Sequence, residues 1–98
     1  MGITAEFNGN YSHDCELVWS KMNSLKLDSN EFVSDRGLYR MYFSFEYNNK
    51  KYNAKAFYNH IDQQFMFTNF ESDFGFTEYE WEIIQNVIAI VTKKDQNL

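Results

Sequence analysis

Residues 39–58 read YRMYFSFEYNNKKYNAKAFY, and this stretch decides the fold because apolar side chains recur at every second position of its first half. The alternating apolar residues are Tyr39, Met41, Phe43, Phe45 and Tyr47. A period of two is typical of a strand with one buried face. Asn48 and Asn49 follow, and Asn tolerates the positive φ angles that a two-residue hairpin turn requires. The stretch therefore predicts an antiparallel hairpin.

The register of this hairpin follows by counting outward from the turn. On one side the facing pairs are apolar: Phe45 with Tyr52, Phe43 with Ala54, Met41 with Ala56, and Tyr39 with Tyr58. The other side pairs Glu46 with Lys51, Tyr42 with Lys55, and Arg40 with Phe57. The first of these three pairs predicts an ion pair and the other two predict cation–π contacts. A single register thus satisfies both faces of the sheet.

Neighbouring segments extend the sheet on both sides of the hairpin. A loop at residues 60–63 places Phe65 opposite Tyr58 and Phe67 opposite Ala56, which predicts a further strand that ends near Phe70. Upstream, a turn at residues 34–37 places Phe32 opposite Tyr39 and Glu31 opposite Arg40, which predicts a short strand. Ile3, Ala5 and Phe7 alternate with polar residues and indicate another short strand before the turn Asn8-Gly9-Asn10. We expect a meander of three or four antiparallel strands.

The first helix is predicted near residues 14–26, with Ser12 or Asp14 as its N-cap. Its apolar residues recur at helical spacing, and they are Leu17, Val18, Met22 and Leu25. The run Asp28-Ser29-Asn30 is rich in turn-forming residues and is expected to end this helix.

The second helix begins at a capping box formed by Thr77 and Glu80, and Phe76 and Trp81 occupy the hydrophobic-staple positions. Its expected apolar face consists of Trp81, Ile84, Val87, Ile88 and Val91. Lys93 and Lys94 close its end, where positive charge is favourable for the helix dipole. The order of elements predicts one small α+β domain over residues 1–98, with both helices packed on one face of the sheet.

The order of helix, three strands and helix resembles that of the double-stranded-RNA-binding domain. That family carries a lysine-rich start to its last helix, where phosphates are contacted. The matching positions of this chain are Glu78, Glu80 and Glu82. These carboxylates would repel RNA, so we do not expect RNA binding of this kind.

The charge of the 98-residue chain is strongly uneven along its length. The formal net charge is -5, and no Lys or Arg occurs between Lys55 and Lys93. The acids of that interval are Asp62, Glu71, Asp73, Glu78, Glu80 and Glu82. Such a surface disfavours direct nucleic-acid and membrane binding and favours a protein partner with a basic surface. The lone cysteine, Cys15, and the absence of an apolar leader or membrane span predict a cytoplasmic protein.

No sequence motif indicates catalysis, and we expect no enzyme, no metal and no cofactor. His13, Asp14, Cys15 and Glu16 are adjacent, but adjacent helical residues point in different directions, and the sequence holds no further Cys or His pair at metal-site spacing. A dyad of Cys15 and His60 is the one catalytic alternative, since a nucleophile and its base need to be close only in space.

Two surfaces are candidate partner sites. The first interleaves acids with aromatics at the start of the last helix and in the preceding loop: Glu71, Asp73, Phe74, Glu78, Tyr79 and Glu82. Aromatic anchors within a charged rim are typical of protein-interaction patches. The second is the outward sheet face, which is unusually apolar and consists of Arg40, Tyr42, Phe57, Met66 and Phe70.

These features favour a small acidic protein-binding module that inhibits a basic nucleic-acid enzyme by occupying its binding channel. Proteins of this kind include phage or mobile-element inhibitors such as anti-CRISPRs. Two alternatives stay open at this point. One is an immunity protein that neutralises a toxin nuclease, and the other is a structural or regulatory adaptor, homodimeric through the outward sheet face.

Overall fold

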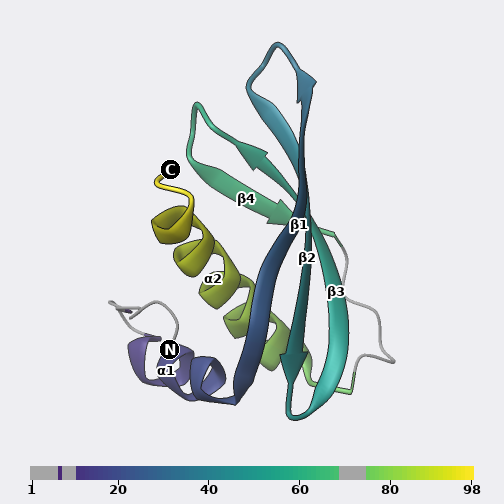
Figure 1. Ribbon diagram of the computed structural model, residues 1–98. Coiled ribbons are helices and arrows are strands. Elements are labelled where there is room, and N and C mark those ends of the chain that lie inside the picture. Colours follow the sequence, from purple (N-terminus) through teal and green to yellow (C-terminus); the bar gives the residue numbers. More distant parts are fainter. Residues whose placement is uncertain (1–6, 8–10, 69–74) are drawn as a thin grey trace. The chain divides into compact units, whose positions relative to one another are not determined.

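The computed structural model describes residues 7, 11–68 and 75–98. In chain order its elements are α1 (Ser12–Lys21), β1 (Met22–Ser34), β2 (Leu38–Tyr47), β3 (Lys50–Asn59), β4 (Gln64–Phe67) and α2 (Glu78–Asp95). The four strands form one sheet in the order β1-β2-β3-β4, a meander in which each strand pairs with its neighbour in sequence (Figure 1). The predicted α+β class and the predicted order of helices and strands are confirmed.

The described residues fall into two compact units, and each is described by itself. One unit takes its residues from Met1–Asn23 and Phe70–Leu98 and holds the two helices. The other, Ser24–Asn69, holds almost all of the sheet.

The β2–β3 register agrees with the predicted one at every pair named above. Met41 lies opposite Ala56 and Arg40 lies opposite Phe57. The turn residues Asn48 and Asn49 have φ angles of 52° and 67°, which is the left-handed conformation that this hairpin requires. The β3–β4 register is also as predicted, with Tyr58 opposite Phe65.

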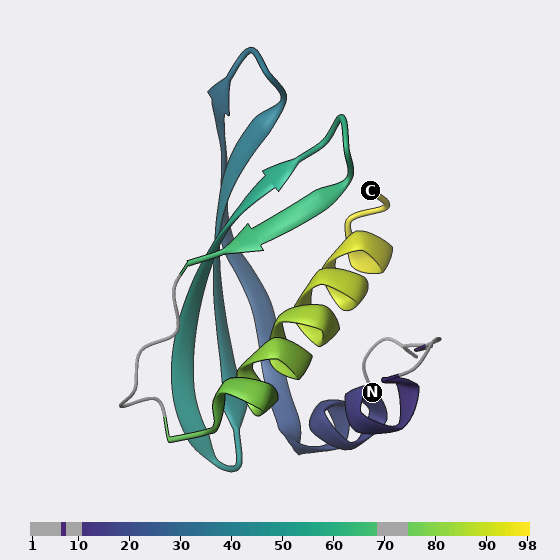
Figure 2. The same cartoon turned by 180° about the vertical axis from the view of Figure 1, so that it is seen from behind.

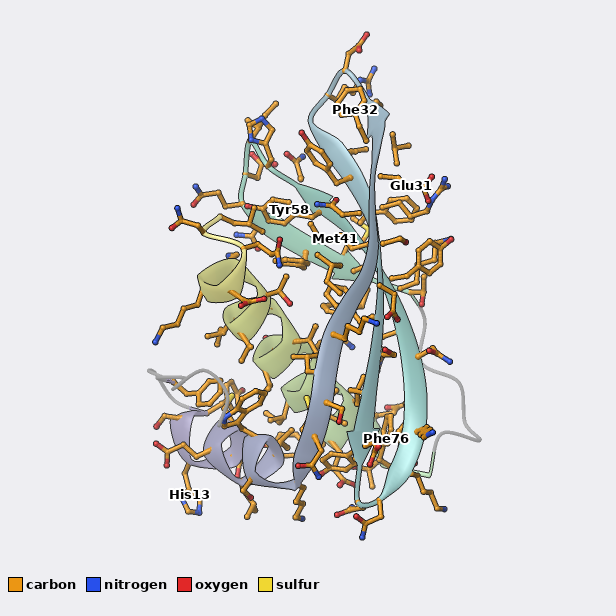
Figure 3. All side chains as sticks on the ribbon, in the orientation of Figure 1. His13, Glu31, Phe32, Met41, Tyr58 and Phe76 are labelled. Atoms are coloured by element: carbon orange, nitrogen blue, oxygen red, sulfur yellow. The ribbon has the colours of Figure 1, made fainter. Side chains whose placement is uncertain are left out.

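One sheet face is buried and the other is not. The side chains on the buried face belong to β2 and β3, and they are Met41, Phe43, Phe45, Tyr47, Ala54, Ala56 and Tyr58. Met41 and Tyr58 point to the opposite side of the sheet from Glu31 (Figure 3). The alternation of burial along β2 and β3 is therefore the alternation seen in the sequence.

Glycine is required in the turn between β1 and β2. Gly37 has a φ of 78°, and its amide donates a hydrogen bond to the Ser34 carbonyl oxygen at 3.1 Å. A Cβ at this position would lie 3.0 Å from Cδ2 of His60 and 3.1 Å from Cγ1 of Ile61. The predicted turn at residues 34–37 is thus confirmed, and it closely approaches the loop after β3.

The predicted first helix is wrong at both ends. Its N-cap is Tyr11 and has no side-chain cap hydrogen bond. The helix ends at Lys21, so residues 22–26 belong to β1. Leu25 and Leu27 are half-buried and alternate with exposed polar residues, which suits a strand, and Ser24 has a φ of 58° that a helix does not allow. β1 was expected to be short but has 13 residues. The run 28–30, which was expected to end the first helix, lies inside this strand.

Two smaller strand predictions also differ from the structure. β4 ends at Phe67 rather than near Phe70, although the Thr68 amide still donates to the Lys55 carbonyl oxygen at 3.0 Å. Of the predicted N-terminal strand, Ile3 and Ala5 lie outside the described residues, and Phe7 is buried but belongs to no strand.

The second helix begins and ends as predicted. The Glu80 amide donates to the Thr77 hydroxyl oxygen and the Thr77 amide donates to the Glu80 carboxylate, both at 3.1 Å. The rings of Phe76 and Trp81 stack with their centroids 5.9 Å apart, which is the predicted staple contact. All five predicted apolar residues of α2 are buried, and Ile83 and Thr92 are buried beside them. α1 packs beside α2, as both views show (Figures 1 and 2).

Candidate functional site

Three of the predicted partner-binding residues lie on the first two turns of α2. Glu78, Tyr79 and Glu82 are all exposed. Glu78 and Glu82 are four residues apart and therefore lie one above the other on the helix surface. The other three predicted residues, Glu71, Asp73 and Phe74, lie outside the described residues.

Two further residues join this surface. They are Tyr11, the N-cap of α1, and Asp14 in the first turn of α1. The Tyr79 hydroxyl donates a hydrogen bond to the Asp14 carboxylate, and the Tyr79 ring meets the Tyr11 ring edge to face, with centroids 6.5 Å apart. Sequence reasoning missed Tyr11 as a site residue and took Asp14 as a cap of α1. Asp14 does lie in the first turn of α1, but its carboxylate binds a phenol of α2 instead of capping its own helix.

We call Tyr11, Asp14, Glu78, Tyr79 and Glu82 the acidic tyrosine patch. Tyr11 is 53% exposed and Tyr79 is 48% exposed, so both rings are available to a partner. The ion pairs Lys26–Asp28 and Arg40–Glu31 both lie in the sheet unit, and neither involves Glu78 or Glu82. Glu78 and Glu82 thus present carboxylates that no lysine or arginine of the described residues neutralises.

The hydrogen bond from Tyr79 also changes the acidity of the phenol. It raises the pKa of Tyr79 from 10.0 to about 12, with smaller contributions from burial and from the Asp14 charge. A proton shared with a neighbouring carboxylate is harder to remove, because its loss would place two negative charges together. Tyr79 is therefore a neutral hydrogen-bond donor at physiological pH.

The outward sheet face is the second predicted site, and the structure brings four of its five residues together. Arg40, Phe57 and Met66 form one row across β2, β3 and β4, and Tyr42 lies beside them on β2. Met66 is 72% exposed. Phe70, the fifth residue, lies outside the described residues.

Of the three predicted pairs on this outward face, the cation–π contact of Lys55 with Tyr42 is confirmed, and the other two differ from the prediction. Arg40 donates to the Glu31 carboxylate at 3.5 Å, whereas it was expected over Phe57. Lys55 takes the place of Arg40 over Phe57, with its Nζ 5.3 Å from the Phe57 centroid, and it also lies 5.9 Å from the Tyr42 centroid as predicted. Glu46 and Lys51 face each other in the register, but they are not among the ion pairs of the described residues. The aromatic residues of this face thus have a partner within the sheet.

Cys15 and His60, the two residues of the candidate catalytic dyad, belong to different compact units. Cys15 is buried, and burial together with the neighbouring Asp14 charge raises the pKa of its thiol. A nucleophilic cysteine needs a depressed pKa, because the thiolate is the reactive form. His60 belongs to the sheet unit, where its ring meets the Tyr39 ring edge to face. Among the described residues, no three His, Cys, Asp or Glu side chains gather into a candidate metal site.

No protein-family model, curated protein or solved structure matches this chain. No helix in the described ranges is long and apolar enough to cross a membrane. The acidic tyrosine patch and the outward sheet face are the two candidate partner surfaces.

Proposed function

We propose that this chain is a protein-binding module that presents the acidic tyrosine patch to a basic site on a larger nucleic-acid enzyme and inhibits that enzyme by occupying the site. The observation that supports this most directly is the hydrogen bond from Tyr79 to Asp14, with two uncompensated glutamates beside it. A surface that is organised before binding loses less entropy when a partner docks.

The composition of the patch suits protein recognition. Tyrosine supplies a large, rigid, amphipathic contact area with few rotatable bonds, and it is enriched at interaction hot spots. The two exposed rings of Tyr11 and Tyr79 are already packed against each other. Each bound tyrosine would therefore lose little side-chain entropy.

The charge of α2 suits a basic partner. From Glu78 to Thr92 the helix carries no Lys or Arg, and Glu78, Glu80 and Glu82 all lie in its first two turns. Carboxylates on such a surface resemble the phosphates that a nucleic-acid channel is built to attract. A counter-defence inhibitor of the anti-CRISPR kind and an immunity protein against a toxin nuclease would both act in this way, and the identity of the target separates them.

Affinity capture from the source cells tests this proposal. The wild-type chain, a Glu78→Lys/Glu82→Lys variant and an Asp35→Lys control would be used as baits at low and high salt. Asp35 is an exposed acid in the turn between β1 and β2, so its reversal changes the net charge while every residue of the patch stays as in wild type. We expect one basic nuclease, polymerase or toxin on wild type and on the control, released by salt, and much less of it on the double variant.

A second candidate function uses the outward sheet face, and the exposure of Met66 and Tyr42 on that face favours it. Here the chain would be a homodimeric adaptor. Light scattering over a range of concentrations tests this alternative with Met66→Glu as the variant, because its exposed side chain can be changed without opening the buried face. A dimer that Met66→Glu dissociates and Glu78→Lys/Glu82→Lys leaves intact would favour the adaptor.

A further inference from the structure

A pocket opens beside the acidic tyrosine patch, within the helical unit. It is lined by Tyr11, Glu82, Ile83, Gln85 and Asn86 and has a volume of about 330 Å³. Pockets for small-molecule ligands are usually about 300–1,000 Å³, so this one is small and suits a single side chain.

The helix sets the chemistry of the pocket. Glu82, Gln85 and Asn86 are spaced at i, i+3 and i+4, and so their side chains share one face of α2. Ile83 is buried at only 2% exposure and supplies the apolar part of the lining. Tyr11 faces this stretch from the N-cap of α1, where its carbonyl oxygen accepts from the Cys15 amide at 2.8 Å. The pocket is therefore lined by one carboxylate residue, two amide residues and one aromatic residue besides Ile83.

We propose that this pocket takes the guanidinium group of an arginine side chain on the partner, an inference that rests on the proposed function and deepens it. The Glu82 carboxylate supplies the charge and can accept two parallel N–H bonds. The amide oxygens of Gln85 and Asn86 accept further N–H groups, and the Tyr11 ring offers a surface for cation–π contact.

The same set of groups selects among ligand classes. An anion would be repelled by the Glu82 carboxylate, and α2 carries no basic side chain before Lys93 that could attract it. A lysine ammonium would satisfy Glu82 but is a compact charge with three donors. The guanidinium group is planar, carries five donors and stacks on aromatic rings, so it can engage Glu82, the amides and Tyr11 together.

Direct titration with a defined probe tests this assignment. The full ¹⁵N-labelled chain would be titrated with N-acetyl-L-arginine amide and followed by two-dimensional NMR of its backbone and side-chain amides. N-acetyl-L-citrulline amide is the neutral control of nearly the same shape, and N-acetyl-L-lysine amide is the charged control. We expect saturable shifts centred on the Gln85 and Asn86 side-chain amides with the arginine probe, and weaker ones with both controls.

Two matched variants separate the pocket from the general acidity of the patch. Glu82→Gln removes the carboxylate that lines the pocket, whereas Glu78→Gln removes an exposed carboxylate one helical turn earlier, outside the lining. Loss of a charge-assisted hydrogen bond should weaken arginine-probe binding about tenfold in Glu82→Gln, with a change of less than about twofold in Glu78→Gln.

Three results would overturn the assignment: shifts that do not saturate, equal shifts with citrulline or lysine, or equal weakening by the two variants. The proposed function is tested separately, by the affinity capture. Salt-sensitive capture that is lost in Glu78→Lys/Glu82→Lys would still support the basic partner, even if the pocket bound no arginine.

Discussion

The Tyr79 hydroxyl donates a hydrogen bond to the Asp14 carboxylate and so joins the first turn of α2 to the first turn of α1. The two residues are 65 positions apart in the sequence. The contact places an aromatic ring of each segment side by side, Tyr11 from the first and Tyr79 from the second. It organises the surface that we propose as the binding site.

Alkaline titration should report this contact. The folded pKa of Tyr79, about 12, lies above the ordinary value of 10.0, so the folded chain holds the phenol proton more tightly than the unfolded chain does. The stabilisation is therefore complete below pH 10 and is lost as the pH rises through about 12. Tyrosinate absorbance, compared between wild type and Tyr79→Phe, should isolate a late-titrating phenol.

Asp14→Asn is the matched variant for this titration. It removes the carboxylate charge but keeps an oxygen that can accept from the phenol. We expect the pKa of Tyr79 to fall back toward 10.0, since the hydrogen bond to the Asp14 carboxylate is the largest cause of its rise and a hydrogen bond to a neutral amide oxygen is weaker. An unchanged late phase in Asp14→Asn would mean that another group holds the Tyr79 proton.

The capping box of α2 should contribute measurably to stability. Thr77→Ala removes the hydroxyl oxygen that accepts from the Glu80 amide, and it should lower the free energy of unfolding by about 1 kcal/mol. Thr77→Ser keeps that oxygen and should stay close to wild type. Urea denaturation of the three proteins measures the difference, and equal losses for Ala and Ser would contradict a capping role.

The turn between β1 and β2 should not tolerate a side chain at Gly37. Gly37→Ala forces a Cβ into a left-handed conformation and against His60 and Ile61, so we expect a loss of about 1–2 kcal/mol or more in the free energy of unfolding. Asp35→Ala, an exposed change in the same turn, should remain within about 0.5 kcal/mol of wild type. Thermal or urea unfolding that ranks the two variants equally would contradict this account of the turn.

Local patterns in the sequence predicted the β2–β3 hairpin and the second helix well. The alternation in β2, the Asn48-Asn49 turn and the Thr77 capping box each specify a conformation through neighbouring residues alone. The end of α1 could not be predicted from neighbouring residues alone, because two local patterns overlap there. Val18, Met22 and Leu25 are spaced as in a helix, but Leu25, Leu27 and Ser29 also alternate as in a strand, and pairing with β2 decides in favour of the strand.

The acidic tyrosine patch was predicted only in part, because two of its five residues come from a distant segment of the chain. Glu78, Tyr79 and Glu82 share one helix and could be grouped from their spacing. Tyr11 joins them only through the packing of α1 beside α2, which no local pattern specifies. Gln85 and Asn86 were not predicted as site residues either, since polar residues on a helix are ordinarily taken to face solvent.

The central claim is that the acidic tyrosine patch binds a basic protein. The most direct test is the salt dependence of the dissociation constant between the purified chain and its captured partner, measured by calorimetry. For wild type and Asp35→Lys we expect tight binding that weakens steeply with salt, because the interacting charges are screened. For Glu78→Lys/Glu82→Lys we expect much weaker binding with a shallower dependence. Equal affinity and equal salt dependence in all three proteins would contradict the claim.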